Sequence, residues 1–314
     1  MIQITQQYRR LAFIISCILG LLVYWKMFKN NYIEENINMT HDFIVPFINY
    51  VPGFFVSPEN KLVACEIRKS MSQLTTNLMC LLYNETQFVA DKNTLNDTWE
   101  APRHCMQEHS FTNFSDDLKN DTDTVKFAFI RDPIRRFLSF YLNKCVDKSE
   151  CYDCGSDMRC VVERIYNGLW NIQNDRNMTF ILMEAHAAPL SWNCGFNEGV
   201  SKWELLMMGS DLDERTSSTT KLAKILRKQG VRHELVESIE KDILKGETAH
   251  STFKSTNRLA AEKQIREDPV VRYFLHKIYF FDYVVFPFKR DVLDPEYRSI
   301  FATAPAKVDI KFFV

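Results

Sequence analysis

The stretch "VKFAFIRDPIRRFLSFYLNKC", residues 125–145, predicts the fold more directly than any other part of the chain. Its first six residues, 125–130, form an apolar run typical of a buried strand. Arg131 follows where that strand meets a loop, a position that hydrophobic burial does not explain. Asp132 can cap a helix, and Pro133 fits the first helical turn, where no backbone N–H is needed. The stretch therefore predicts a strand, a short loop that carries an arginine, and a helix.

The predicted helix has an apolar face and a polar face. Helical spacing places five apolar side chains together: Ile134, Phe137, Leu138, Tyr141 and Leu142. Arg135 and Ser139 are four residues apart and share another face, which looks back toward the end of the strand.

An earlier segment repeats this design. Residues 61–67, "KLVACEI", predict a buried strand, residues 68–73, "RKSMSQ", a polar loop, and residues 74–84, "LTTNLMCLLYN", a helix. Two such units imply parallel strands whose loops meet at the carboxyl edge of the sheet, where ligands bind in open α/β folds. The predicted fold class is α/β, with a central parallel sheet and flanking helices.

The later part of the chain is predicted to be mainly helical. The segments concerned are 158–172, 199–209, 214–230 and 232–245. A strand-like aromatic run, "YFFDYVVFPF" at 279–288, is expected to end the compact part.

The loop at 68–73 has the composition of an anion site at a helix N-terminus. It offers Arg68, Lys69, Ser70, Ser72 and Gln73, and backbone N–H groups and the helix dipole add to their attraction for anions. The GxxxxGK[ST] pattern is absent, so neither an ordinary nucleotide-triphosphate loop nor a nucleotide kinase is favoured. The alternative is a solvated basic turn in which a serine caps the helix.

The second unit offers a second anion site. Arg131 can form a planar, charge-assisted fork with a phosphate, and Ser139 can add a short neutral hydrogen bond. Two anion sites at neighbouring strand ends suit a nucleotide that carries phosphates at both its 5′ and its 3′ end.

Residues 129–145, "FIRDPIRRFLSFYLNKC", resemble the 3′-phosphate motif of the Golgi carbohydrate sulfotransferases. Arg131, Arg136 and Ser139 are in register with that motif. The resemblance is closest to the membrane-bound group that includes chondroitin 4-O- and HNK-1-type enzymes, in a divergent invertebrate form.

Other segments resemble the same family over roughly residues 60–290. "ACEIRKSMSQL" is similar to the family's 5′-phosphosulfate loop, C-x-x-P-K-x-x-x-T, with Cys65 and Lys69 matching. Arg68 replaces the proline of that pattern and Gln73 its threonine. "HAAPLSWNC", residues 186–194, and "FFDYVVFPF" are similar to two further family segments.

The resemblance implies a P-loop-like sulfotransferase architecture with 3′-phosphoadenosine-5′-phosphosulfate (PAPS) as the donor. Arg68, Lys69, Ser70, Ser72, Gln73, Arg131 and Ser139 are then the expected cofactor-binding residues. Lys69 is expected to stabilise the charge that grows on the leaving group, and no metal is required. His109 is the expected general base, because its position before the strand is similar to that of the base in related uronyl sulfotransferases. His104, His186 and Glu108 remain alternatives.

The N-terminus predicts a membrane anchor. Residues 11–25, "LAFIISCILGLLVYW", are apolar, and the run extends through Met27 and Phe28. A cleaved signal peptide is the alternative, but the run ends in Tyr24 and Trp25 without a small-residue cleavage site. The expected organisation is a cytoplasmic tail at 1–10, a transmembrane signal anchor at 11–28, a lumenal stem at 29–58, a sulfotransferase domain at 59–290 and a C-terminal extension at 291–314.

Glycosylation sequons and cysteines agree with a lumenal body. Six sequons follow the apolar run, at Asn38, Asn84, Asn96, Asn113, Asn120 and Asn177. Eight of the nine cysteines also follow it, and an even number in an oxidising compartment predicts disulfides of undetermined pairing. The cluster "CVDKSECYDCGSDMRC" contains one CxxC, and zinc is the alternative there.

The predicted function is transfer of a sulfuryl group from PAPS to a hydroxyl of a glycan, glycosaminoglycan or glycoprotein-borne, in the Golgi lumen. The expected protein is a single-pass type II Golgi membrane enzyme. A formal net charge of −1 gives no global basic field, so nucleic acid is not an expected partner. The alternative is a catalytically inactive glycan- or nucleotide-binding protein that keeps the fold.

Overall fold

The computed structural model of the chain describes residues 42–50, 53–103, 105, 110–111, 115–175, 180–208, 212–245 and 256–288. Contacts divide the chain into Met1–Phe43 and Ile44–Val314, and every element named below belongs to the second unit. The predicted anchor at 11–28 and the extension at 291–314 lie outside the described residues. Within the described ranges, no helix combines the length and the apolar character that a membrane crossing requires.

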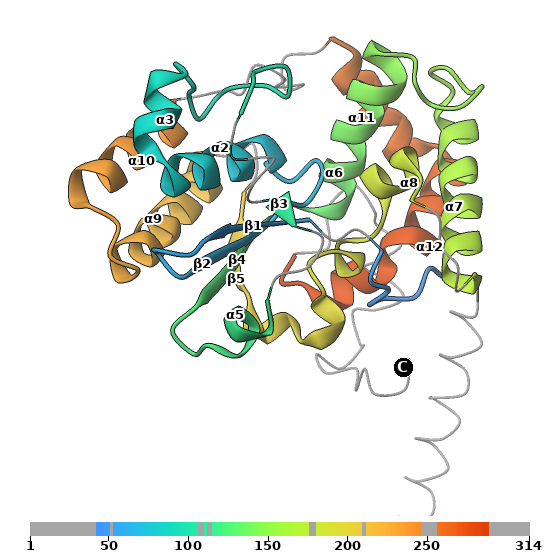
Figure 1. The fold of residues 1–314 in the computed structure, drawn as a ribbon. Coiled ribbons are helices and arrows are strands. Elements are labelled where there is room, and N and C mark those ends of the chain that lie inside the picture. The colour runs from blue at the N-terminus through green and yellow to red at the C-terminus, as the bar shows by residue number, and fades with distance from the viewer. Residues whose placement is uncertain are drawn as a thin grey trace, which may run out of the picture. The chain divides into compact units, whose positions relative to one another are not determined.

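A five-stranded sheet lies at the centre (Figure 1). Its order is β3-β1-β2-β4-β5, formed by β1 (Phe54–Ser57), β2 (Leu62–Cys65), β3 (Ser110–Phe111), β4 (Val125–Ile130) and β5 (Glu204–Met207). The predicted strands at 61–67 and 125–130 are confirmed as β2 and β4. They pair in parallel, with Cys65 opposite Ala128. Their carboxyl ends, and hence the two predicted anion loops, lie side by side.

The sheet is mixed, which corrects the expectation of a parallel one. β1 runs antiparallel to both β2 and β3. Only residues 58–61 join β1 to β2, and a parallel crossover needs a dozen or more residues, so this pair forms a hairpin. Strand β1 also lies inside the segment predicted as a stem, so residues 54–57 belong to the sheet.

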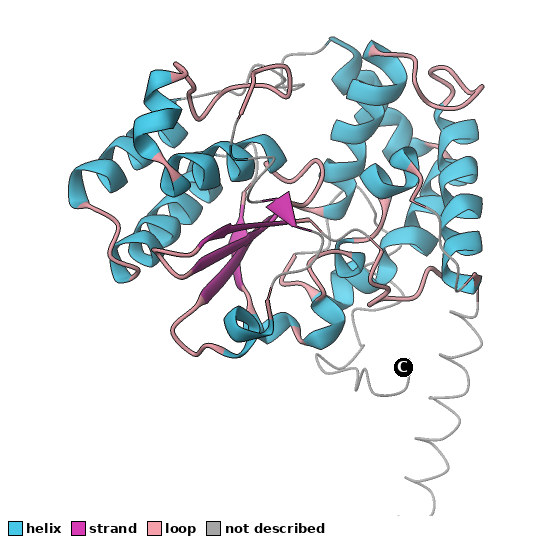
Figure 2. Ribbon diagram, viewed as in Figure 1, coloured by secondary structure: helices cyan, strands magenta, loops and turns pink. Residues whose placement is uncertain are grey.

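Helices cover both faces of the sheet (Figure 2). One apolar cluster joins a face to α2 (Ser72–Tyr83), α9 (Leu212–Lys228) and α10 (His233–Lys245). A second cluster joins the other face to the segment 190–203 and to Phe286, beyond α12 (Pro269–Val285). The other α-helices within the described ranges are α3 (Glu85–Ala90), α5 (Asp116–Asn120), α6 (Pro133–Phe140), α7 (Met158–Asn174), α8 (Leu182–Ala187) and α11 (Thr256–Glu267).

Two of the predicted elements are wrong. The segment predicted as a helix at 199–209 forms a short 3₁₀ turn at Val200–Lys202 followed by β5, because Gly199 has a φ of 124° and Glu204–Met207 pair with β4. The strand-like run at 279–288 belongs to α12 as far as Val285. Asp268 caps this helix by accepting hydrogen bonds from the backbone N–H of Val270 and Val271. A continuous apolar run suits a buried helix as well as a strand, and here its length decides.

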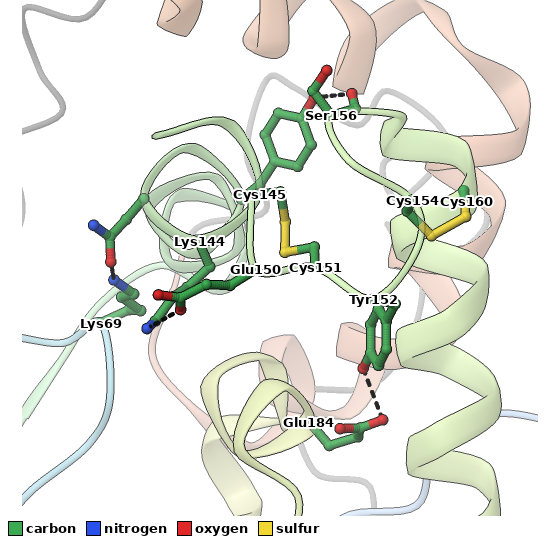
Figure 3. The surroundings of a disulfide bond; sticks show 12 residues. Lys69, Lys144, Cys145, Glu150, Cys151, Tyr152, Cys154, Ser156, Cys160 and Glu184 are labelled. Carbon is green, nitrogen blue, oxygen red and sulfur yellow. Dashed lines mark hydrogen bonds and ion pairs between the residues drawn. A yellow bond between two sulfur atoms is a disulfide. The ribbon is translucent and has the colours of Figure 1, made fainter. Parts of the chain in front are cut away.

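Four disulfides confirm the expectation from the cysteines. The pairs are Cys65–Cys194, Cys80–Cys105, Cys145–Cys151 and Cys154–Cys160. The CxxC cysteines Cys151 and Cys154 belong to two different disulfides, so the zinc alternative does not hold for this cluster (Figure 3).

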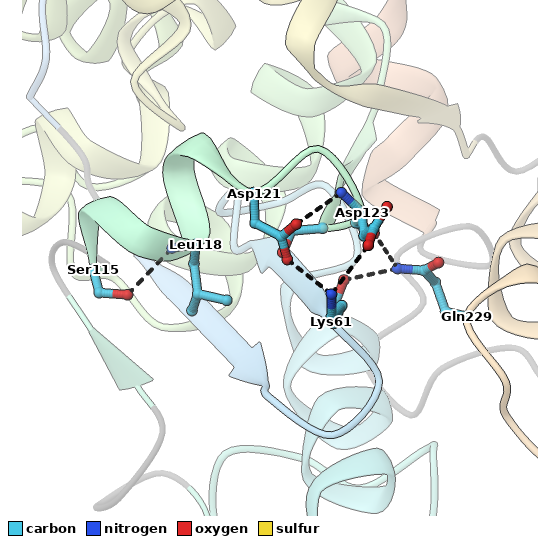
Figure 4. Close-up of polar contacts among 7 residues, drawn as sticks. Lys61, Ser115, Leu118, Asp121, Asp123 and Gln229 are labelled. Carbon is cyan, nitrogen blue, oxygen red and sulfur yellow. Dashed lines mark hydrogen bonds and ion pairs between the residues drawn. The ribbon is translucent and has the colours of Figure 1, made fainter.

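Ion pairs join the loops at the amino edge of the sheet (Figure 4). Lys61 Nζ lies 3.3 Å from Asp121 and 3.2 Å from Asp123. Gln229, in the turn after α9, donates hydrogen bonds to the carbonyls of Lys61 and Asp123, both at 2.9 Å. These contacts tie the β1–β2 hairpin to the loop before β4.

Candidate active site

The loop between β2 and α2 has an unusual backbone. Lys69 and Met71 adopt left-handed conformations, with φ of 64° and 59°. Met71 stands at the N-cap of α2 without a side-chain hydrogen bond, and the first turn carries no acidic residue. Neither the N-cap side chain nor an acidic residue of the first turn therefore neutralises the positive end of this helix dipole.

Ser70 adds a hydroxyl to the same loop. Its side chain is buried, and Oγ finds no hydrogen-bond partner in the described part of the chain. Buried hydroxyls are nearly always paired, so an orphaned one calls for an explanation. An anion held at the start of α2 would accept this hydrogen bond.

Lys69 lies against the π-helix Tyr141–Asp147, which continues α6 (Figure 3). Its Nζ donates a 2.5 Å hydrogen bond to Asn143 Oδ1. Burial, and then the charges of Lys144, Lys148 and Arg131, lower the pKa of Lys69 to about 7. Glu150 acts in the opposite direction, but it is bound to Lys144 at 2.6 Å. The site thus holds more positive charge than its own carboxylates balance.

Arg131 follows β4, the neighbour of β2. Burial, and then Arg258 and Arg135, lower its pKa to about 10. Arg258 belongs to α11, so a third segment of the chain contributes positive charge here. Because Arg131 also acts on Lys69 electrostatically, the two predicted anion sites are parts of one cation cluster.

The start of α6 differs from the start of α2. Asp132 caps α6, its Oδ1 accepting a 2.9 Å hydrogen bond from the Arg135 backbone N–H. Tyr283 donates to the other oxygen of Asp132 at 2.8 Å. A carboxylate already occupies this helix end, so a second anion must be held by side chains such as Arg131 and the half-buried Ser139.

Arg136 links three segments of the chain through hydrogen bonds to backbone carbonyls. It is fully buried and donates to the carbonyl of Arg68 at 3.2 Å and to the carbonyl of Ala188 at 2.7 Å. The guanidinium thereby ties α6 to the loop before α2 and to the segment that follows α8.

The alternative base His186 lies close to the cation cluster. Its Nδ1 is 2.7 Å from the carbonyl of Leu182, which identifies Nδ1 as the protonated nitrogen and leaves the lone pair on Nε2. Burial lowers its pKa to about 3, and Lys69 and Arg68 contribute to the shift. In the ligand-free protein this imidazole is therefore neutral.

Comparison with known proteins fits this arrangement. A model of the sulfotransferase family matches residues 52–289, most of the chain and all of the site. The chain belongs to the sulfotransferase family. No solved structure matches it significantly.

Two nematode proteins are similar to this chain over most of its length. Carbohydrate sulfotransferase chst-1 of Caenorhabditis elegans is 31% identical over 257 residues, which cover 78% of each chain. An uncharacterized protein of the same nematode is 27% identical over 263 residues, which cover 80% of this chain and 73% of the relative. Members of the family transfer sulfuryl groups, and chst-1 is named for transfer to carbohydrate.

The structure brings most of the predicted sulfotransferase site residues to one edge of the sheet. Arg68, Lys69 and Ser70 lie in the loop after β2, and Ser72 and Gln73 open α2. Arg131 follows β4, and Ser139 lies on α6. His109, with His104 and Glu108, lies outside the described residues, so the base stays a prediction. The described ranges contain no group of metal-ligating side chains.

The sequence analysis missed Asn143, Lys144 and Glu66. Asn143 comes four residues after Ser139, a spacing that suggests a shared α-helical face, but the π-helix that brings Asn143 to Lys69 gives no signal in the sequence. Glu66 follows β2 directly, and burial raises its pKa, against the opposing effect of Arg68. A glutamate inside an apolar strand end gives no signal of its own in the sequence.

Proposed function

We propose that this sulfotransferase moves a sulfuryl group from PAPS to a hydroxyl of a glycosaminoglycan-like glycan in the Golgi lumen. The family match and the similarity to a carbohydrate sulfotransferase support sulfotransfer to carbohydrate. The observation that carries the proposal is the cluster of Lys69 and Arg131 at neighbouring strand ends, with surplus positive charge between them.

The residues present fit the donor. The uncapped start of α2 and the orphaned Ser70 hydroxyl suit the 5′-phosphosulfate, and Arg131 and Ser139 suit the 3′-phosphate. When bound, PAPS supplies the activated sulfuryl group and a leaving group on which negative charge grows.

Lys69 is the residue that stabilises this growing negative charge. A bound polyanion raises the pKa of Lys69 and keeps it protonated, because the anion offsets Lys144, Lys148 and Arg131. The left-handed backbone and Asn143 fix where Nζ stands before the reaction, so little reorganisation is required.

The acceptor hydroxyl must lose a proton during transfer. We keep His109 as the proposed base. His186 is affected electrostatically by Lys69, but its low pKa makes it a weak base until a bound anion raises that pKa.

The proposed location is the Golgi membrane, with the catalytic domain in the lumen. The apolar run at 11–28 motivates the type II anchor. Four disulfides suit an oxidising compartment, and three sequon asparagines within the described ranges, Asn84, Asn96 and Asn120, are exposed.

The test is transfer of radiolabelled sulfate from PAPS to a panel of unsulfated and desulfated glycans, followed by linkage analysis of the product. Incorporation into a glycan is expected, and incorporation into none would reject the proposal. The replacements at Arg68 and Gln73 favour one alternative, a silent binding protein, which would retain glycans on a column without labelling them.

A further inference from the structure

Residues 180–182 form an exposed apolar segment beside the cation cluster. Phe180, Ile181 and Leu182 are 52%, 42% and 45% exposed, although each is a large hydrophobic side chain. Scattered apolar side chains on a surface need no explanation, but three in succession form a patch. The segment leads directly into α8, which carries His186.

The patch is held in place from below. Tyr50 OH accepts a 2.8 Å hydrogen bond from the Ile181 N–H, and its ring stacks on Phe180 with centroids 6.2 Å apart. Tyr50 in turn packs edge-on against the fully buried Trp192. His186 Nδ1 donates to the Leu182 carbonyl. The apolar side chains are therefore presented on anchored backbone, as a binding platform requires.

Arg68 lies over this platform. Its guanidinium carbon is 5.2 Å from the centre of the Phe180 ring, within cation–π range. Its side chain makes no ion pair and no hydrogen bond with any residue of the described ranges. Two carboxylates are near the platform. Burial raises the pKa of Glu66 and the charge of Arg68 lowers it, but the two side chains do not form an ion pair. Glu184 is buried and accepts a 2.8 Å hydrogen bond from Tyr152 OH.

We propose that Arg68 and the platform Phe180–Leu182 form an acceptor subsite for a uronic acid residue of the glycan. The apolar platform would pack against the C–H face of the sugar ring. The guanidinium would pair with the uronate carboxylate, a planar match that favours arginine over lysine. This inference rests on the proposed function and names the class of acceptor. It also gives Arg68 a role in acceptor binding rather than the predicted role in cofactor binding.

The test compares two anionic polymers, unsulfated chondroitin and heparosan, with their carboxyl-reduced, neutral forms. For wild type, we expect a KM about tenfold lower for at least one anionic polymer than for its neutral form. Arg68→Ala should abolish this preference by raising only the KM of the anionic polymer. Phe180→Ala should raise both KM values several-fold. Calorimetry with adenosine 3′,5′-bisphosphate should give dissociation constants within about twofold of wild type for both variants.

Matched controls separate the subsite from general surface effects. Trp99 is 46% exposed and lies 5.8 Å below Arg103, so Trp99→Ala removes a comparable aromatic elsewhere. Arg227→Ala removes an arginine that is paired with Glu240. Neither control should change the ratio of KM values.

Three results would overturn the inference. The first is an unchanged KM ratio in Arg68→Ala, and the second is a loss of bisphosphate affinity in that variant, which would return Arg68 to the donor site. The third is wild-type sulfation of neutral glycans only.

If wild type sulfates nothing, the proposed function fails. Calorimetric binding of chondroitin and heparosan in the presence of the bisphosphate then tests whether the subsite exists. Binding that depends on Arg68 supports it, and binding that does not depend on Arg68 rejects it.

Discussion

Two lysines at opposite ends of strand β2 have opposite electrostatic environments. Lys61 precedes the strand at the amino edge of the sheet, where hydrogen bonds to Asp123 and Asp121 raise its pKa. Lys69 follows the strand at the carboxyl edge, where burial and three neighbouring cations lower its pKa to about 7. A lysine is thus surrounded by carboxylates at one end of β2 and mainly by other cations at the other end.

The difference separates scaffold from site. At the amino edge, Lys61 forms ion pairs with Asp121 and Asp123, and these pairs connect the loops there (Figure 4). At the carboxyl edge, burial and neighbouring cations instead lower the pKa of Lys69, an imbalance that a bound anion would offset. A lowered lysine pKa inside a cation cluster is typical of functional sites, and here burial and neighbouring cations cause it.

The largest effect is expected when each of the two lysines is replaced in turn. Lys69→Ala should lower kcat about 10²–10³-fold, as loss of one preorganised donor does, while bisphosphate affinity falls much less. Lys61→Ala should leave kcat close to wild type, because its partners lie at the far end of β2. The measurement is sulfate transfer under saturating PAPS. Similar rates for the two variants would show that the two edges do not differ in function.

Arg131 should have the next largest effect. Arg131→Ala is expected to weaken binding of adenosine 3′,5′-bisphosphate by about 1.5–3 kcal/mol, the usual contribution of a charge-assisted hydrogen bond. Isothermal titration measures this directly. Arg227→Ala is the matched control, since Arg227 is also an arginine but lies in a surface ion pair. An Arg131→Ala affinity equal to wild type would remove the 3′-phosphate assignment.

The pH dependence of binding should sharpen the contrast. In the free protein Lys69 is protonated below about pH 7, so above that pH the bisphosphate must bind together with a proton. Affinity should fall up to about tenfold from pH 7 to 8 in wild type, but not in Lys69→Gln.

Asn143→Asp places a carboxylate 2.5 Å from Nζ and should raise the pKa of Lys69, which moves the loss of affinity to higher pH. Calorimetry at several pH values measures both effects, and ionisation of the ligand is common to all three proteins. A wild-type slope that Lys69→Gln retains would assign the pH dependence to another group.

The smallest effect is expected at the capped helix. Asp132→Ala removes the N-cap of α6 and should lower the free energy of unfolding by about 1–2 kcal/mol. Asp132→Asn keeps an acceptor oxygen and should lower the free energy of unfolding by a smaller amount. Denaturant titration distinguishes them. Equal losses in both variants would show that the hydrogen bond to the Arg135 N–H is not what stabilises the start of this helix.

The regular parts of the site could be predicted from the sequence, because they follow local rules. Apolar runs gave β2 and β4, and the pair Asp132–Pro133 gave the start of α6 with its cap. Parallel pairing of the two strands then predicts that Lys69 and Arg131 lie at neighbouring strand ends, and the observed register agrees.

The rest depended on contacts that the sequence does not show. The π-helix that brings Asn143 to Lys69 has the same composition as an α-helix. Phe180 is positioned by Tyr50, which lies 130 residues earlier in the chain, stacks on the Phe180 ring and accepts a hydrogen bond from the Ile181 N–H. Strand β5 is only four residues long, and β4 beside it determines its conformation more than its own sequence does.

The Cys65–Cys194 bond joins the last residue of β2 to the segment after α8, across 129 positions of sequence. In the chain-entropy treatment, a crosslink of that span stabilises a fold by roughly 4–5 kcal/mol. Copies retained in a reducing cytosol would lack this bond directly beside the donor loop. A reducing compartment would thus leave the loop after β2 without this covalent support, and recombinant production calls for an oxidising host.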